Sequence, residues 1–252
     1  MEQDKSTTTE TEMGYLDHFA ELRKRLIWTA VVFVIFFIVG FYFEKHIRAF
    51  LLDQIDLTLH LIAPEEILWI IITIAFIVAL IATLPFLCVQ IWLFIKPALT
   101  QKERKAALAY IPVIFILFLI GLGFGYYIFS SLILPFVLSL NGDMFDTIFT
   151  VERYFRFMFN VILPFAFFFE VPVITMFLTS LGIVTPAFLS KTRKYAYFIL
   201  IIIGTMITPP DFILQIVVAI PLIILYEISI TLSRIVYRKK EAKHREFMEN
   251  GE

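Results

Sequence analysis

Two acidic residues in basic surroundings are the first candidates for a binding site. Glu21 lies in the amphipathic segment YLDHFAELRKRLI (15–27), close to Arg23, and Glu103 is the single acid of the loop KPALTQKERK (96–105). Two carboxylates near one membrane face can together bind a forked, cationic guanidinium group. The simpler interpretation is an interfacial helix and a solvated loop whose basic residues only orient the chain. Both interpretations stay open from the residues alone.

A third acid, Glu170, interrupts the apolar run LPFAFFFEVPVIT (163–175), and no other charged residue lies within ten positions of it. An ionisable side chain at mid-membrane costs at least about 2.5 kcal/mol on insertion scales, so a function is the first hypothesis. Pro164 and Pro172 flank the acid and predict a local distortion of the helix. The simpler interpretation is a hydrogen bond to another span. Side chains of suitable type for that bond are Thr208, Gln215 and Gln90.

The elements that must position these acids are membrane-spanning helices. Apolar residues make up 60% of the 252 residues and the mean hydropathy is +0.87, whereas soluble domains are about 45–50% apolar. The apolar residues form long blocks with few charges, a pattern typical of transmembrane helices. We therefore predict an all-α integral membrane protein with six spans. These spans are 26–43, 67–95, 106–135, 157–184, 195–207 and a last one from 212 to between 227 and 237.

Lysine and arginine determine the predicted orientation. With the N-terminus inside, 17 of the 21 basic residues fall in inner segments and four in outer ones. Because cytoplasmic loops carry the excess of basic residues, both termini are expected in the cytoplasm, and the number of spans is then even. The outer segments 44–66 and 136–156 contain apolar side chains and are expected to form a structured external cap. The last two helices are expected to be short: either the fifth thins the bilayer locally, or the last two segments form a shallow hairpin that turns at TPPD (208–211).

The predicted domain organisation is a membrane domain between two tails. Residues 1–13 are expected to be a disordered cytoplasmic tail, 14–237 the membrane domain and 238–252 a charged cytoplasmic C-terminal tail. Within the membrane domain, GLGFG places Gly121 and Gly125 four residues apart, a spacing typical of close helix packing. Asp211 is expected to cap the last helix.

Enzyme chemistry is not expected from this sequence. The single cysteine, Cys88, lies in an apolar block, and the four histidines lack ligand spacing. A glycine-rich phosphate loop is also missing. We therefore expect no catalytic residues, no metal and no cofactor.

Several motifs together resemble one known family. They are LDHFAELRKRL, QIWLFIKPALTQKERK, FFFEVPV, SLGIVTPAFL, KYAYF and MITPPDFILQ. In this order they resemble the TatC family, the largest membrane component of the twin-arginine protein translocase, over roughly residues 14–237. The resemblance implies six helices with both termini cytoplasmic, arranged as a concave, glove-like wall with an external cap. It also implies a location in the cytoplasmic membrane of a prokaryote.

The resemblance further implies a function and the residues that carry it. TatC proteins bind the signal peptides of folded export substrates, which contain consecutive arginines, and export is driven by the protonmotive force. Signal-peptide recognition is thereby assigned to Glu21, Arg23 and Glu103. An intramembrane polar site that docks the single-span partners TatA and TatB is assigned to Glu170, Thr208 and Gln215. A homo-oligomer within the receptor complex is implied as well.

Two other functions stay open from the residues. One is a proton-coupled transporter of small solutes that uses Glu170 as its proton carrier, although no internal repeat supports it. The other is a purely structural membrane scaffold.

Overall fold

The structure is a computed structural model that describes residues 4–53, 58–99, 101–140, 148–208 and 211–249. Apart from two strands of two residues each, the regular structure of these residues is helical. Among these described residues, five helical segments are long and apolar enough to cross a membrane. They are Phe19–Asp53, Glu65–Ile95, Ala107–Ser139, Val151–Leu181 and Phe212–Ala242. The predicted all-α integral membrane fold is confirmed.

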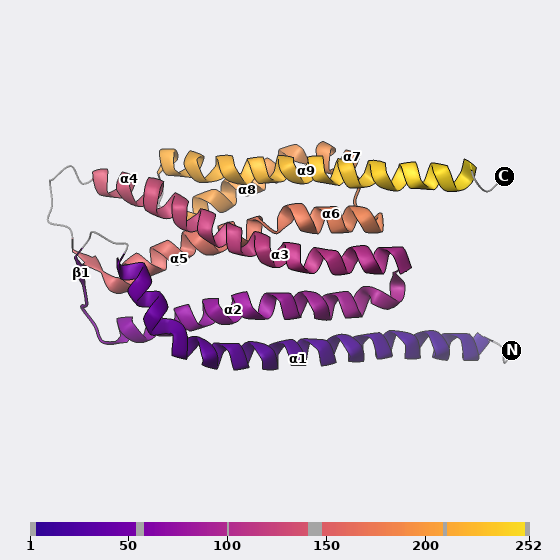
Figure 1. Ribbon diagram of the computed structural model, residues 1–252, viewed down its shortest axis with the longest axis horizontal. Coiled ribbons are helices and arrows are strands. Elements are labelled where there is room, and N and C mark those ends of the chain that lie inside the picture. The colour runs from indigo at the N-terminus through magenta and orange to yellow at the C-terminus, as the bar shows by residue number, and fades with distance from the viewer. Residues whose placement is uncertain (1–3, 54–57, 100, 141–147, 209–210, 250–252) are drawn as a thin grey trace. The chain divides into compact units, whose positions relative to one another are not determined.

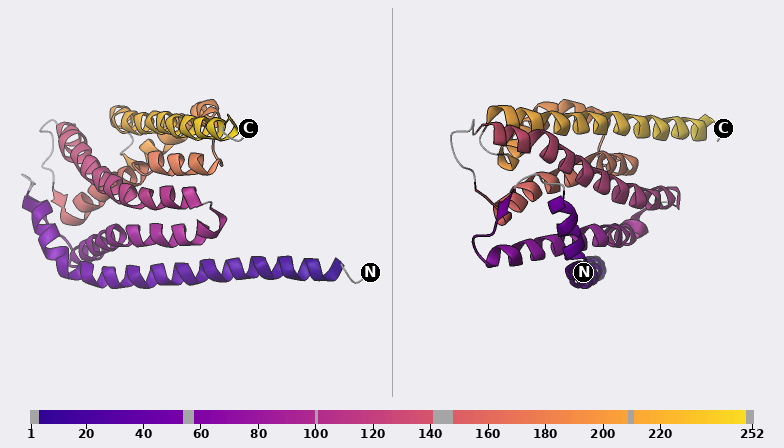
Figure 2. Two further views of the ribbon diagram at one scale, coloured as in Figure 1. Left: turned by 45° about the vertical axis from the view of Figure 1, so that its right-hand side comes forward. Right: turned by 60° about the vertical axis from the view of Figure 1, so that its left-hand side comes forward.

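The chain forms two compact units. The first comprises 1–56 and 68–111, and the second comprises 57–67 and 112–252. In the first unit, α1 (Asp4–Asp53) runs beside α2 (Glu65–Ile95), as Figures 1 and 2 show. Gly40 permits their close approach, because a Cβ atom at this position would lie 2.7 Å from the Ala75 carbonyl oxygen. The short 3₁₀ helix η1 (Lys96–Ala98) then leads towards α3 (Gln101–Ile128).

In the second unit, α3 continues through a π-helical turn into α4. The π-helix η2 covers Phe129–Ile133 and α4 covers Leu134–Ser139. Across from α3 lies α5 (Val151–Phe168), and the predicted close packing at the two glycines is confirmed. A Cβ atom on Gly121 would lie 2.7 Å from the Ala166 Cα atom, and one on Gly125 would lie 2.9 Å from the Ile162 Cα atom. Only a residue without a side chain allows this approach of the two helices.

The C-terminal helices pack around α9. They are α6 (Val171–Leu181), α7 (Pro186–Lys191), α8 (Arg193–Ile207) and α9 (Phe212–Glu249). Figure 1 shows α6 and α7 alongside α9, and the hydroxyls of Thr179 on α6 and Ser233 on α9 are hydrogen-bonded at 2.7 Å. Asp211 caps α9 as predicted, since its Oδ1 atom accepts from the backbone N–H groups of Ile213 and Leu214 at 2.8 and 3.0 Å.

Two details differ from the sequence predictions. The segment 185–194, which lies between the predicted fourth and fifth spans, contains the short helix α7, whose first residue is Pro186 and whose N-cap is Thr185. The last helix is not short: α9 has 38 residues, because the polar segment after Tyr237 is rich in good helix formers and carries the helix on. By contrast, α8 is short as predicted, with 15 residues.

The predicted outer segments contain regular structure. Strand β1 (Leu59–His60) pairs in parallel with β2 (Phe149–Thr150), so the two segments are joined by a backbone ladder. The buried Glu66 side chain accepts from the Glu152 backbone N–H at 3.5 Å, at the start of α5. These contacts join 59–66 to 149–152 through strands that were not predicted, and the external cap stays a prediction.

The tail boundaries remain predictions. The first helix begins at Asp4, within the segment 1–13 that was predicted to be disordered, and α9 continues through most of 238–252.

Candidate functional site

Glu21 is held in an ion pair within α1. The Arg25 guanidinium, one turn further along, donates to the Glu21 carboxylate, and its Nε atom lies 3.1 Å from the same oxygen. A further Arg25 nitrogen donates to the Oε1 atom of Gln90 on α2 at 3.3 Å. The Glu21 side chain keeps 40% exposure, so a ligand from solution can still reach the carboxylate.

The segment between α2 and α3 is fixed by one arginine. The Arg104 Nε atom donates to the carbonyl oxygens of Lys96 and Leu99 at 2.9 and 3.0 Å. The Trp92 indole donates in turn to the Arg104 carbonyl at 3.1 Å, and the Lys96 ammonium lies 5.2 Å from the centre of the Trp92 ring. Because η1 leaves carbonyl groups without helical partners, these bonds hold the segment in one conformation.

The predicted recognition residues lie in the same compact unit. Arg23 is exposed on α1, two residues after Glu21. Glu103 lies in the first turn of α3, and its side chain is outside the described part of the structure. The structure therefore places one carboxylate in an accessible ion pair and the other on a helix that begins after a rigid segment.

Glu170 lies at a break between two helices. α5 ends at Phe168 and α6 begins at Val171, so the predicted distortion is confirmed. Pro172 explains the break, because its ring nitrogen carries no hydrogen and cannot donate to the carbonyl four residues earlier. At the break, the Glu170 backbone N–H donates to the Phe167 carbonyl at 3.1 Å. This bond reaches three residues back, whereas an α-helical bond reaches four.

The Glu170 side chain is buried without a partner. It is 6% exposed, and neither carboxylate oxygen has a hydrogen bond to another described residue. Among the described residues it is the one acid whose buried carboxylate oxygens have no hydrogen-bond partner. The equally buried Glu66 accepts a hydrogen bond from the Glu152 backbone N–H. A buried polar group without a partner costs free energy, so the chain retains this acid at a cost to its own stability.

Thr208 and Gln215 form separate contacts. The Thr208 hydroxyl donates to the Gly204 carbonyl at 3.0 Å and is buried. The Gln215 side-chain amide donates to the Thr205 hydroxyl at 2.6 Å on an exposed face of α8 and α9. The suggestion that Thr208, Gln215 or Gln90 hydrogen-bonds to Glu170 is wrong for the described conformation, because neither Glu170 carboxylate oxygen has a partner and the three side chains bond to other groups.

Sequence reasoning missed two residues of the first compact unit that bind the segments carrying Glu21 and Glu103, namely Arg25 and Arg104. The role of Arg25 could have been predicted from the sequence, because it follows Glu21 by four residues and this spacing places both side chains on one face of a helix. Arg104 has no such signal, because its role as a donor to carbonyl groups depends on the path of the backbone through η1.

Comparison with known proteins identifies the family. Residues 17–221 match the family described as Sec-independent protein translocase protein (TatC). The chain belongs to the TatC family. It is 46% identical over 229 residues to the TatCd protein of Bacillus subtilis (strain 168), an alignment that covers 91% of this chain and 95% of the relative. The TatCy protein of the same organism is 44% identical, with 91% and 92% covered.

A solved TatC structure has the same fold. A crystal structure described as the twin arginine translocase receptor TatC superposes with a TM-score of 0.76 at 34% sequence identity, covering 87% of this chain and 99% of the other. The resemblance to TatC that the sequence motifs indicated is confirmed over nearly the whole chain.

Proposed function

We propose that this TatC protein is the receptor for twin-arginine signal peptides and the core component of a translocase. In this role it exports folded proteins across the cytoplasmic membrane, driven by the protonmotive force. The observation that carries the proposal is the Glu21–Arg25 ion pair: an exposed carboxylate already binds a guanidinium group, the chemical group that a signal-peptide arginine presents. A solved relative described as the twin arginine translocase receptor supports the same role.

In the proposed recognition step, one signal-peptide arginine takes the place of Arg25 on Glu21. Glu103 binds the second arginine, and Arg23 orients the peptide through its backbone or acidic groups. The rigid segment before α3 supports this step, because a binding group held in position loses little conformational entropy when the ligand arrives.

The proposed topology has six crossings and both termini in the cytoplasm. In this arrangement α8 is the fifth crossing. Its 15 residues extend about 22 Å at about 1.5 Å per residue, which is shorter than a hydrocarbon core of about 30 Å. Local thinning of the bilayer accommodates the difference. The distribution of basic residues supports this topology, since 17 of 21 then lie on the cytoplasmic side.

Glu170, Thr208 and Gln215 are proposed as an intramembrane polar site for single-span partners of the TatA and TatB type. The unpartnered carboxylate of Glu170 supports the assignment, because a polar side chain of a partner helix would supply the missing hydrogen bond. Association of several copies of the chain in one receptor complex is part of the same proposal.

Site-specific crosslinking tests the receptor proposal. A photo-crosslinking residue in the segment 96–105 is expected to capture a twin-arginine signal peptide in native membranes. A charge-assisted hydrogen bond contributes about 1.5–3 kcal/mol, so Glu21→Gln and Glu103→Gln are each expected to lower the yield about tenfold or more. Glu152→Gln, which removes an acid paired with Arg156 in the same i,i+4 manner, is the control. Equal yields from all three variants and the wild type would contradict the assigned roles.

A further inference from the structure

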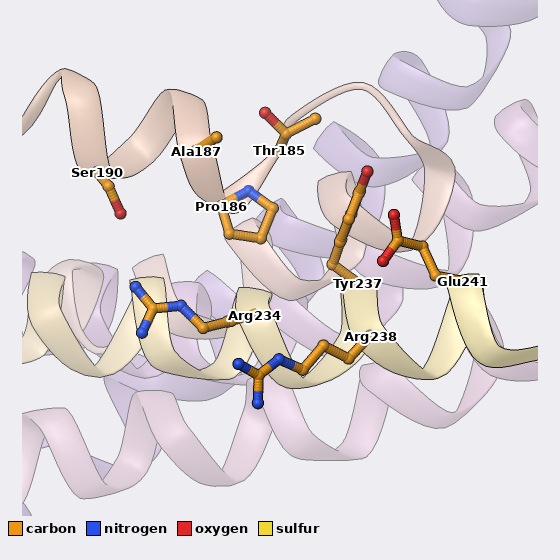
Figure 3. Close-up of a pocket in the computed structure, with 8 residues that line it drawn as sticks. All are labelled: Thr185, Pro186, Ala187, Ser190, Arg234, Tyr237, Arg238 and Glu241. Carbon is orange, nitrogen blue, oxygen red and sulfur yellow. The ribbon is translucent and has the colours of Figure 1, made fainter.

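A pocket that contains none of the residues discussed above lies between α7 and the C-terminal half of α9 (Figure 3). Its volume is about 460 Å³, within the range of small-molecule sites. The lining residues are Thr185, Pro186, Ala187, Ser190, Arg234, Tyr237, Arg238 and Glu241.

The pocket has two cationic side chains that are not neutralised by described residues. Arg234 and Arg238 are exposed, and neither makes an ion pair or hydrogen bond with another described residue. The one acid of the lining, Glu241, is hydrogen-bonded to the Tyr237 hydroxyl. In Figure 3 both guanidinium groups point back along α9, away from Glu241, and the Ser190 hydroxyl points towards α9. The lining therefore offers forked cationic donors and a hydroxyl group to an anion.

The pocket wall and the two helices that form it also carry apolar side chains. Pro186 and Ala187 form part of its wall. On the same two helices, outside the pocket lining, Phe188 of α7 is 58% exposed and Ile235 of α9 is 47% exposed. The apolar segment of α9 that can cross a membrane ends at Ala242, and the two arginines lie in its last turns. By length and composition, the pocket therefore lies near the end of the span, where the hydrocarbon core of a membrane would meet the headgroup region.

We propose that this pocket binds the phosphate group of an anionic phospholipid. Arginine binds phosphate through two parallel N–H donors, and basic groups beside a membrane helix attract anionic lipids. Free phosphate offers the same anion, but only a lipid has acyl chains to cover Phe188 and Ile235. The exposed apolar groups beside the arginines therefore favour the lipid as the source of the phosphate.

Native mass spectrometry of the full-length protein in detergent, titrated with phosphatidylglycerol, tests the proposal. The variant Arg234→Gln/Arg238→Gln is expected to raise the dissociation constant of the first bound lipid roughly tenfold. The control Lys194→Gln/Lys239→Gln removes two charges from exposed positions that do not line the pocket, and a change below about twofold is expected. Arg234→Lys/Arg238→Lys keeps both positive charges but lacks the paired N–H donors of a guanidinium group. This variant is expected to raise the dissociation constant by an intermediate amount.

Three outcomes would overturn the proposal. Equal weakening by the two glutamine pairs would show general attraction of anionic lipid rather than a site. Displacement of the lipid by millimolar inorganic phosphate would identify free phosphate as the ligand. Binding of phosphatidylcholine as tight as that of phosphatidylglycerol would remove the role of the anionic headgroup. Thermal unfolding without added lipid should be the same for all variants, because the altered side chains are exposed.

Discussion

The Arg25 guanidinium is bound by two partners at once, the Glu21 carboxylate on its own helix and the Gln90 side chain on the next. This relationship gives Glu21 an internal ligand of the same kind as the arginine that a signal peptide would bring. In the proposed recognition step, binding of the peptide is an exchange of one guanidinium for another, and the internal pair opposes it.

Removal of the internal competitor is expected to strengthen peptide binding. An exposed i,i+4 pair contributes about 0.3–0.5 kcal/mol, so Arg25→Gln should lower the Kd for a twin-arginine peptide about twofold, measured by fluorescence anisotropy in detergent. Arg48→Gln is the matched control, because Arg48 forms the same i,i+4 pair with Glu44 elsewhere on α1. A weaker affinity in Arg25→Gln would mean that Arg25 holds Glu21 in position rather than competing for it.

Glu170 is expected to reduce the stability of the protein that retains it. Both carboxylate oxygens are buried without partners, so Glu170→Leu should raise the free energy of unfolding by about 1–3 kcal/mol. Denaturant unfolding of the purified protein in micelles measures this change. Glu66→Leu provides the contrast: Glu66 is also 6% exposed but accepts a backbone N–H, so its loss should lower stability.

The same Glu170 variant separates stability from function. If the acid binds a partner helix, Glu170→Leu should abolish export of a folded reporter and co-purification of TatA-type proteins while the variant unfolds less readily. Normal export by this variant would reduce Glu170 to a structural residue. Solute uptake by the purified protein alone, lost in Glu170→Leu, would instead favour the transporter hypothesis.

The glycines of α3 are expected to differ in their tolerance of a methyl group. Gly121→Ala places a Cβ atom 2.7 Å from the Ala166 Cα atom, and such overpacking costs about 1–3 kcal/mol. Gly123→Ala, on the same helix, meets no atom within 4 Å and should gain up to about 1 kcal/mol from helix propensity. The difference between their midpoints of unfolding measures the packing of α3 on α5; equal midpoints would mean that the helices do not approach so closely.

Arg104 is expected to act on recognition without touching the peptide. Arg104→Ala removes the donor that satisfies the Lys96 and Leu99 carbonyls, so hydrogen exchange of the Leu99 backbone amide should become faster. Peptide affinity should fall several-fold because the segment before α3 is no longer held in position. Unchanged exchange at Leu99 would show that the Trp92 contact alone is sufficient.

Much of the architecture was accessible from the sequence because membrane segments require long apolar runs. Of the two prolines that predicted a distortion in the fourth block, Pro172 lies at the break and Pro164 lies inside α5. Gly121 and Gly125 marked a close helix contact. The length of α9 was misjudged because hydropathy reports where a membrane segment ends and not where a helix ends. The segment SLGIVTPAF contained the signals of α7, since Gly182 takes a positive φ of 82° at the end of α6 and Thr185 caps the next helix.

The candidate site was harder to predict than the fold. The acids were found because a charge in an apolar or basic setting is conspicuous in a sequence. Their partners depend on three-dimensional distances: Gln90 could be named only by type and was matched to the wrong residue, and the pairing of Gln215 with Thr205 across two helices has no local signal.

The π-helical turn between α3 and α4 shifts the phase of the side chains between the two helices. The Leu134 backbone N–H donates to the Phe129 carbonyl five residues earlier, so the turn holds one residue more than an α-helical turn. Each residue of an α-helix advances the side chains by about 100° around the axis. The faces of α3 and α4 are therefore out of phase by one position, and a single-residue deletion within 129–133 would bring them into continuous register without interrupting the helix.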